Sequence, residues 1–417
     1  MSAPIKINKT IVLVLVCLGV AYFSYAIDRF AFSFLVPNVS AAFSIPLSLS
    51  GLLGTIFLYG QIAGSVPAGF FLSRYGYKYT LSVGIGVATL GVFLTAAAIN
   101  TTFVLVARIL TGIGEGFWSV SIVLTLANIF ASRRGIGVGI SQNFFGVGLF
   151  FGPFLAGLIL NATNLWRDVF YIFGVIGSVG TLLIVLVVKR RYTDPEKADA
   201  HALNTHHESA KDKLDLTIFR SYMTYIPVVL LALYEVTFWG WTISVSSYLE
   251  NVLRFNVVTA GFLAGADGIS ILGLSWLAGY FGDRFNRRWA FAVGGVVQGV
   301  VAVIAYSTFP GFYSFLCLAL LFGFFTIMIY VAIFAHISET FRKKDASVVT
   351  GITFGVGLVF AGSIGKIMFD FISRFGWSAA SVYLIGIPSF AMAVLGLLFI
   401  RPVTHSAELP GDGLEAD

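Results

Sequence analysis

The chain has 417 residues, of which 58% are hydrophobic and only 11% charged, and its net charge is +6. Because ordinary soluble domains carry about a quarter charged residues, this composition excludes a soluble globular protein. The basic residues are spread over many short polar intervals along the chain, which argues against a nucleic-acid partner.

Long apolar stretches recur along the whole chain, and each can cross a hydrocarbon core of about 30 Å, which takes about 20 helical residues. In lipid the backbone must satisfy its own hydrogen bonds, and the alternating pattern of a barrel strand is absent, so these stretches are predicted to be helices. The fold class is an all-α membrane protein. Twelve transmembrane helices are predicted at residues 10–37, 48–72, 79–98, 103–129, 136–160, 168–188, 222–248, 258–281, 289–308, 312–338, 346–373 and 379–400.

The basic residues indicate the orientation of the chain. Of the 26 Lys and Arg, 20 fall on the side of the N-terminus, three in the opposite loops and three inside spans. This is the bias expected when the basic side faces the cytoplasm, so both termini are predicted to be cytoplasmic. Short loops and a short tail favour the cytoplasmic (inner) membrane of a prokaryotic cell.

One long polar interval divides the predicted spans into two groups of six. His206 and His207 lie within it and are interpreted as part of a solvated linker, so no metal or other cofactor is predicted. The predicted parts are an N-terminal six-helix bundle at 1–188, a cytoplasmic linker at 189–221, a C-terminal six-helix bundle at 222–401 and a cytoplasmic tail at 402–417.

A short loop recurs once in each half, as GFFLSRYGYK after the second span and GYFGDRFNRR after the eighth. Its basic residues can engage backbone carbonyls at helix ends or carboxylates between the halves. Alternatively they only anchor the chain on the cytoplasmic side, which leaves the shared Gly-x-x-x-x-Arg spacing unexplained. A structural or gating role is therefore predicted for Arg74, Lys78, Asp283 and Arg284.

This loop resembles the signature of the major facilitator superfamily. The resemblance covers nearly all of the chain and implies two pseudo-symmetric six-helix bundles. The first copy has Ser73 where the family pattern has Asp, whereas Asp283 and Arg284 keep the pattern. RILTGIGEG in the fourth span and GLFFGPFLAG in the fifth are further matches, and their glycines are expected to permit close contact between spans.

Four ionisable residues fall inside the first and fourth spans: Asp28, Arg29, Arg108 and Glu115. Counted from the span ends, they share one layer between the midplane and the outer surface, and Arg108 and Glu115 share one helix face. Burying a charge alone costs several kcal/mol, so these groups either form a functional site or neutralise one another and pin the first helix to the fourth. Arg108 is the member with the strongest structural character.

The pattern Asp-Arg-x-x-x-Ser in the first span, followed by Arg-x-x-x-Gly-x-Gly-Glu in the fourth, resembles the anion:cation symporter family. That family includes bacterial sugar-acid transporters and the animal sialic-acid, phosphate and vesicular glutamate carriers. The resemblance implies that Arg29 binds the substrate carboxylate and that Asp28 and Glu115 carry coupling protons. The chemistry agrees, because a guanidinium offers a planar fork for a carboxylate, and a carboxylate in a partly dehydrated site takes up a proton more readily.

Further polar and aromatic residues complete the predicted site. Glu235, near the middle of the seventh span, is predicted to couple protons, whereas Lys366 and Asp370 are predicted to neutralise each other as an i,i+4 pair. The side-chain amides of Gln142 and Asn143 could contact a hydroxylated substrate or hold helices together. The rings of Trp239 and Trp241 could instead pack in the core or lie at the membrane interface. Additional substrate-binding residues are predicted at Tyr25, Gln142, Asn143, Trp239 and Trp241.

The sequence predicts a secondary active transporter that carries a small organic anion, a carboxylate or sugar acid, together with a proton by alternating access. An alternative is a proton-driven exporter of amphipathic or cationic compounds, suggested by the Gly-Pro motif and the 41 Phe residues. A receptor or scaffold is disfavoured because no extramembrane domain is predicted. No phosphate loop or nucleophile-base pattern points to an enzyme. The expected partners are the substrate and the lipid bilayer, and the chain is expected to act as a monomer without a protein partner.

Overall fold

The computed structural model describes residues 9–129, 134–193, 221–284, 287–341 and 343–400, and these residues are almost entirely helical. Most of the helices are apolar on every side, as expected for segments that face lipid or other helices. The first half contains α1 (Lys9–Ala42), α2 (Leu47–Tyr75), α3 (Tyr77–Ala96), α4 (Thr101–Ile129), α5 (Arg134–Thr163), α6 (Trp166–Leu186) and the short α7 (Arg190–Thr193). The second half contains η3 (Tyr222–Thr224), α9 (Tyr225–Asn251), α10 (Val257–Ala264), α11 (Ala266–Arg284), α12 (Arg287–Ser307), α13 (Phe312–Thr340), α14 (Lys343–Ser381), η4 (Val382–Gly386) and α15 (Ile387–Phe399).

The described residues contain 11 helical stretches that are long and apolar enough to span a membrane, and the last of them is 51 residues long. A helix of that length would measure about 75 Å, more than twice the hydrocarbon core, so this stretch must cross twice. Gly376 interrupts it with a φ of 81° and a ψ of 173°. Dividing the stretch there gives the twelve predicted spans.

The eighth predicted span, 258–281, differs from its prediction as a single helix. The helix is divided at Gly265 into α10 and α11. A Cβ atom on Gly265 would lie 2.6 Å from the carbonyl oxygen of Phe150 in α5, so the backbones approach too closely there for any larger residue.

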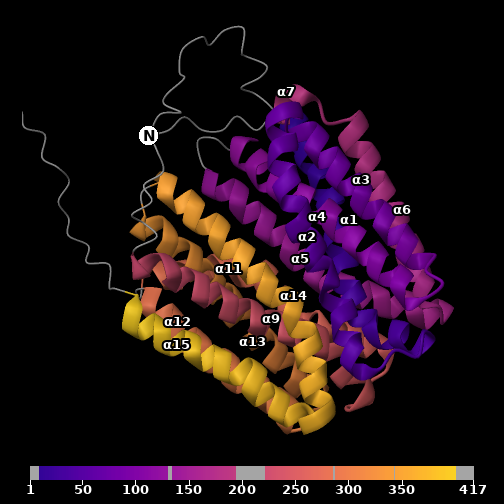
Figure 1. Cartoon of the computed structure of the whole chain (residues 1–417), viewed down its shortest axis with the longest axis vertical. Helices are drawn as coiled ribbons and strands as arrows, with labels where there is room; N and C mark the ends of the chain where they lie inside the picture. Colours follow the sequence, from indigo (N-terminus) through magenta and orange to yellow (C-terminus); the bar gives the residue numbers. More distant parts are fainter. Residues whose placement is uncertain (1–8, 130–133, 194–220, 285–286, 342, 401–417) are drawn as a thin grey trace, which may run out of the picture.

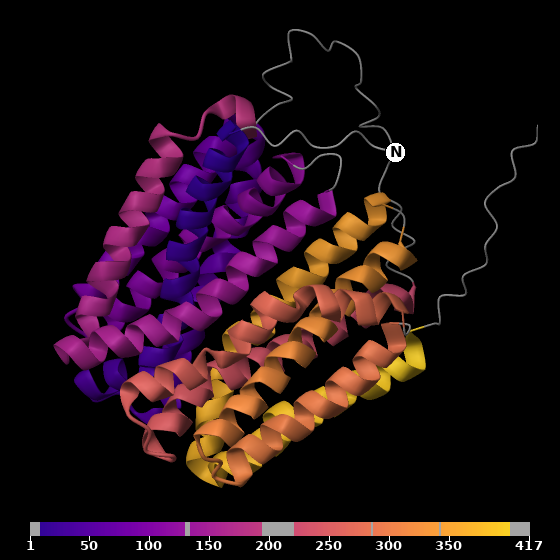
Figure 2. The ribbon, with the colours of Figure 1, turned by 180° about the vertical axis from the view of Figure 1, so that it is seen from behind.

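The helices form two groups that follow the chain order (Figures 1 and 2). In the first group α4 packs against α2 and α3, and α1 packs against α5 and α6. In the second group α13 packs against α11 and α12, and α14 packs against α9. The predicted linker lies mostly outside the described residues, as do His206, His207 and the tail.

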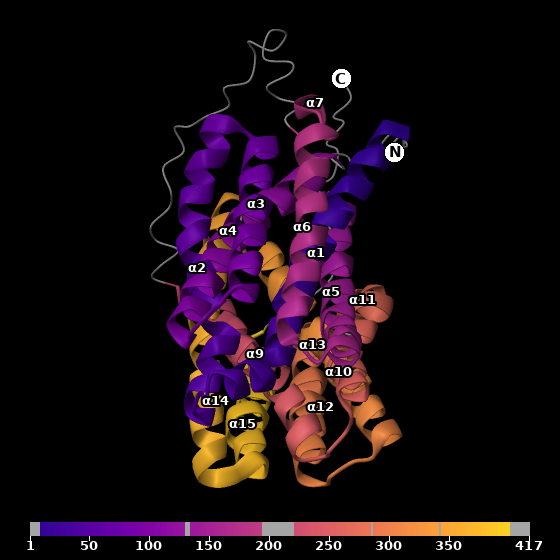
Figure 3. The ribbon, with the colours of Figure 1, turned by 90° about the vertical axis from the view of Figure 1, so that its right-hand side faces the viewer.

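Glycines bring the two groups into close contact at one end of the molecule. We call the end at which α1 begins and α6 ends the terminal end, and the opposite end the far end (Figure 3). Gly51, near the far end of α2, lies directly against Gly365 of α14. Gly157 of α5 lies against α10, where a Cβ atom would be 2.7 Å from the carbonyl oxygen of Val257. The halves are therefore closed against each other at the far end.

Toward the terminal end this contact is lost. Gly351, Gly355 and Gly362 share one face of α14 because they are separated by four and seven residues. A Cβ atom on Gly362 would lie 2.9 Å from the ring of Tyr59 in α2, whereas Gly351 and Gly355 have nothing within 4 Å. The two groups of helices diverge in the same direction in Figure 2. The two groups of helices therefore touch at the far end and diverge toward the terminal end.

Candidate functional site

The structure brings the four predicted charges of α1 and α4 together as two separate ion pairs. Arg108 contacts Asp28 with 2.8 Å between Nη1 and Oδ2, and Arg29 lies near Glu115 with 3.8 Å between Nη1 and Oε2. Because neighbouring residues on a helix point about 100° apart, Asp28 and Arg29 reach different partners. The antiparallel course of α4 places Glu115 closer to the terminal end than Arg108. The Asp28–Arg108 pair is therefore in close contact, whereas the Arg29–Glu115 pair is 1.0 Å longer.

The Asp28–Arg108 pair is fully enclosed. Arg108 has no exposed surface, and its guanidinium also lies over the ring of Phe32 at 4.2 Å. Removing one partner from such a pair costs about 3–5 kcal/mol, because the other charge is left buried and uncompensated. The contact therefore pins α1 to α4, which agrees with the structural character predicted for Arg108.

Arg29 is held more loosely. Its guanidinium donates from Nη1 to the Tyr25 hydroxyl at 2.7 Å and from Nη2 to Oε1 of Gln61 at 3.3 Å. Among the described residues, Arg29 Nε and both carboxylate oxygens of Glu115 have no hydrogen-bond partner. At 3.8 Å, Arg29 and Glu115 attract each other without forming a hydrogen bond. The site thus contains a buried cation, Arg29, and a buried anion, Glu115, each with atoms that can still form hydrogen bonds.

Gln61 and Ser119 belong to the site although the sequence analysis did not single them out. Gln61 donates from Nε2 to the Ser119 hydroxyl at 3.1 Å, and that hydroxyl lies 3.4 Å from the Tyr25 hydroxyl. With the two Arg29 bonds, these contacts close a ring of four side chains from α1, α2 and α4. Two features of the sequence could have pointed to them: Gln61 is an amide within an apolar span, and Ser119 follows Glu115 by one helical turn.

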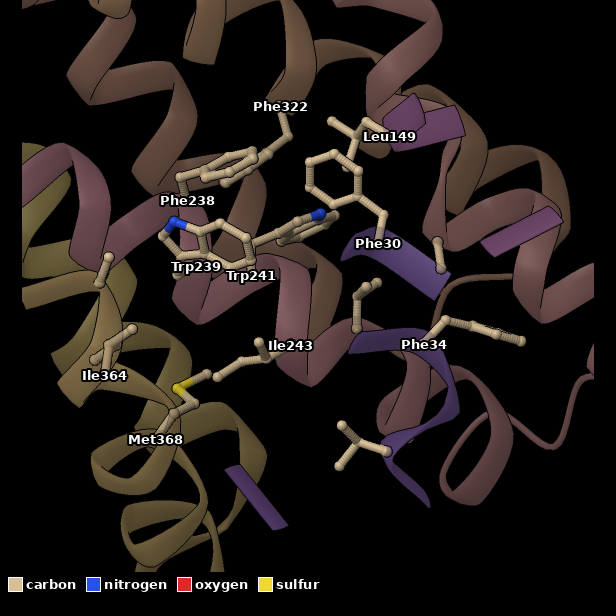
Figure 4. Close-up of a cluster of buried hydrophobic side chains, with 14 of the residues drawn as sticks. Phe30, Phe34, Leu149, Phe238, Trp239, Trp241, Ile243, Phe322, Ile364 and Met368 are labelled. Carbon is tan, nitrogen blue, oxygen red and sulfur yellow. The ribbon is translucent and has the colours of Figure 1, made fainter. Parts of the chain in front are cut away.

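Two aromatic rings, one from each half, lie against Arg29. The centre of its guanidinium lies 4.9 Å from the ring of Phe57 in α2 and 5.0 Å from the ring of Trp239 in α9. Trp239 also stacks on Phe30 of α1, with ring centroids 6.1 Å apart. Figure 4 shows Phe30 and Trp239 in this cluster between the halves. The Phe57 and Trp239 rings touch each other edge to face, with centroids 5.5 Å apart, so both lie on the same side of the guanidinium and stabilise its charge.

Glu235 reaches the site from the second half. It is buried, interacts electrostatically with Arg29 and accepts a hydrogen bond from the side chain of Trp239. The two copies of the repeated loop begin 210 residues apart, and the same offset relates Glu235 to Tyr25 and Trp239 to Arg29. Equivalent positions of the two halves therefore face each other across the site.

A small cavity lies behind the charges, inside the first half. It has a volume of about 10 Å³, the size needed for one water molecule, and is lined by residues that include Ser24, Asp28, Thr111 and Glu115. One oxygen of Asp28 and both oxygens of Glu115 lack a hydrogen-bond partner among the described residues. Both carboxylates thus border one water-sized cavity.

Other predicted site residues lie apart from Arg29. Trp241 stacks on Phe322 at 4.3 Å inside the second half (Figure 4), and it is not among the aromatic residues that lie over Arg29. The Asn143 amide is exposed and accepts a hydrogen bond from the Ser275 hydroxyl at 3.3 Å, which joins α5 to α11. The side chain of Gln142 lies outside the described residues.

The loop residues lie at the terminal end, away from the charges. Lys78 donates from Nζ to the carbonyl oxygen of Val185 in the last turn of α6 at 2.8 Å, and Arg74 is exposed, with its guanidinium 5.4 Å from the Tyr75 ring. The side chains of Asp283 and Arg284 lie outside the described residues.

An exposed ion pair predicted from the sequence is present at the far end. Lys366 and Asp370 form their i,i+4 pair with 2.6 Å between Nζ and Oδ2, and both side chains are partly exposed. This prediction is confirmed, and the pair makes no contact with the buried charges.

Twelve spans in two halves, with charges buried where the halves meet, define the class of multi-pass membrane transporters. The chain belongs to the major facilitator superfamily, whose family model matches residues 18–365 and 228–416. Solved structures show the same fold. A D-xylose–proton symporter superposes with a TM-score of 0.76 at 16% identity over 94% of this chain and 99% of that one. A bacterial homolog of the human lysosomal transporter Spinster, in an inward-facing conformation, superposes with a TM-score of 0.73 at 17% identity. The match covers 94% of this chain and 96% of that one.

Sequence relatives agree with the resemblance to the anion:cation symporters. Human sialin is 30% identical over 58% of this chain, and the match spans 50% of sialin, so the chain covers about half the length of that relative. A probable 4-methylmuconolactone transporter of Cupriavidus pinatubonensis is 25% identical over 95% of this chain and 92% of its own length. A probable sulfoacetate transporter of Cupriavidus necator is 24% identical over 95% of both chains. The chain thus belongs to a family of transporters and not of enzymes.

Proposed function

We propose that the protein is a proton-coupled symporter that carries a small organic anion, a carboxylate or sugar acid, across the inner membrane of the cell by alternating access. The relative named for sulfoacetate transport supports an anionic substrate. The proposal also draws on the chemistry of the buried site.

Arg29 is the single observation that carries the proposal. It is a buried, permanently charged group where the two halves meet, and its Nε has no partner among the described residues. Its nearest carboxylate is too far away for a hydrogen bond. A substrate carboxylate could therefore form a charge-assisted hydrogen bond that the protein itself leaves unmade.

Glu115 provides a route for coupling. Ionised, it competes with a substrate anion for the positive charge of Arg29, and protonated it does not. Proton binding and anion binding then favour each other at one electrostatic site, which is the reciprocity that symport requires. Asp28 and Glu235 are further proposed proton carriers, although the close contact of Asp28 with Arg108 also gives it a structural role.

The orientation follows from combining the basic-residue bias with the shape of the molecule. If the terminal end faces the cytoplasm, this conformation is closed to the outside and open to the inside. It is then the state from which the substrate is released.

A thermal-shift assay on the purified protein tests the anionic specificity, because a ligand that binds the folded state raises the melting temperature. We expect organic acids to stabilise the wild type and Arg29→Ala to lose this response. Lys366→Ala, which removes a cation from the exposed pair, is the matched control and should keep the response. Stabilisation by lipophilic cations, with no response to acids, would support the exporter and contradict the proposal.

A further inference from the structure

Aromatic rings from both halves surround the anion-binding group. Besides the adjacent rings of Phe57 and Trp239, Arg29 has the ring of Tyr25 at 6.0 Å from its guanidinium. Phe57 and Tyr25 come from the first half and Trp239 from the second. A ligand that reaches Arg29 from the terminal end therefore meets ring faces and edges of both halves.

On the side of the second half, the rings continue from Trp239 toward the terminal end. Phe238 contacts Trp239 at 5.4 Å and stacks on Tyr234 at 5.9 Å with only 7° between the ring planes. Tyr234 in turn contacts Tyr330 of α13 at 5.4 Å. These four residues form what we call the aromatic wall. Among its immediate neighbours on α9, only Glu235 is charged.

The first half offers a second set of rings opposite this wall. Tyr22 packs edge-on against Tyr25 at 5.4 Å and against Trp118 of α4 at 6.2 Å. Aromatic residues of α1 and α4 in the first half and of α9 and α13 in the second half therefore lie near the anion-binding group.

The polar groups near Arg29 are largely engaged with one another. The oxygen of Gln61 accepts from Arg29, its nitrogen donates to Ser119, and the Tyr25 hydroxyl accepts from Arg29. Asn143 is bonded to Ser275 away from this cluster. A sugar acid needs partners for four or five hydroxyl groups, and each unpaired buried hydroxyl weakens binding. Among the described residues this environment favours an anion with few hydroxyl groups.

We propose that the site selects carboxylates with a flat, unsaturated ring, in which Arg29 binds the carboxylate and the ring inserts between Tyr22 and Tyr25 on one side and the aromatic wall on the other. This inference rests on the proposed anion transport and narrows its substrate class. Flat rings gain from offset-stacked and edge-to-face contacts, which puckered saturated rings and polyhydroxylated chains form less well.

The test compares four probe anions in the full-length protein: benzoate, cyclohexanecarboxylate, gluconate and acetate. Binding is measured by calorimetry on wild type, Arg29→Ala, Tyr330→Leu and Tyr313→Leu. Tyr313 is the matched control because it lies on the same helix, α13, but is 80% exposed. We expect benzoate to bind the wild type most tightly, and Tyr330→Leu to weaken benzoate by roughly two- to tenfold while leaving acetate unchanged. Tyr313→Leu should leave both unchanged.

The outcomes separate this inference from the function on which it rests. If gluconate or cyclohexanecarboxylate binds at least as tightly as benzoate in an Arg29-dependent manner, the ring-selectivity inference is wrong while anion transport stands. If Tyr330→Leu weakens acetate and benzoate equally, the aromatic wall does not select the ring. If none of the four anions binds the wild type, both proposals fail.

Discussion

Glu115→Gln is the change that isolates the proposed coupling between proton and anion. It keeps the size of the side chain and its place in α4 but permanently removes the negative charge, as protonation would. Wild-type anion affinity should rise as the pH falls, because protonation of Glu115 releases Arg29. In Glu115→Gln, Arg29 has no competing negative charge at position 115 at any pH. The anion affinity should therefore be high throughout and depend on pH only weakly.

The magnitude follows from the distance between the two groups. Opposite charges 3.8 Å apart attract each other by about 4 kcal/mol at an effective dielectric constant of about 20. Tyr25 and Gln61 keep their bonds to Arg29, so a substrate gains only part of this energy. We therefore expect Glu115→Gln to bind the anion at least tenfold more tightly than the wild type at pH 8, a difference of about 1.4 kcal/mol.

Calorimetric titration of a bound organic acid at pH 6 and pH 8, in wild type and Glu115→Gln, measures this effect. In proteoliposomes the variant should still exchange anions across the membrane but should no longer accumulate them in response to a proton gradient. Weaker anion binding in Glu115→Gln, or a pH dependence equal to that of the wild type, would refute the reasoning. In that case Asp28 or Glu235 would be the groups to examine, because both are buried near Arg29.

Three further predictions follow from the contacts. Arg108→Met should destabilise the protein by about 3–5 kcal/mol in thermal or denaturant unfolding, because it leaves Asp28 buried without a partner. The double variant Arg108→Met/Asp28→Leu should recover most of this loss. Equal instability of the single and double variants would contradict the prediction. Gln61→Ala should weaken anion binding by roughly ten- to a hundredfold without a large change in melting temperature, whereas an unchanged affinity would show that Gln61 does not position Arg29. Gly365→Val should push α14 away from α2 and hinder closure of the far end, seen as lost cross-linking between engineered far-end cysteines. Gly355→Val, on an open part of the same helix, should retain that cross-linking.

The sequence was sufficient to predict the spans and the position of the charges. Apolar length is a direct consequence of bilayer thickness, so the twelve spans could be read without knowledge of packing. The shared layer of Asp28, Arg29, Arg108 and Glu115 followed from counting along antiparallel helices. Their division into one close pair at 2.8 Å and one loose pair at 3.8 Å did not follow, because it depends on the directions of the side chains.

Helix rotation set the main limit on predicting the site. Trp239 and Trp241 are two residues apart and so point about 200° apart around α9, and only Trp239 meets Arg29. Nothing in the sequence alone distinguishes the two tryptophans. Gln61 lacked a charge to draw attention to it, although its amide completes the ring around Arg29. The interruption at Gly265 depends on contact with α5, which local propensity does not encode.

The most direct test of the central claim is uptake of a labelled organic acid into proteoliposomes driven by an inward proton gradient. Wild type should accumulate the acid and carry protons with it, and collapse of the gradient should abolish accumulation. Arg29→Ala and Arg29→Lys should both fail, since lysine lacks the planar fork of the guanidinium, while Lys366→Ala should transport normally. Uptake by Arg29→Ala at the wild-type rate would contradict the account.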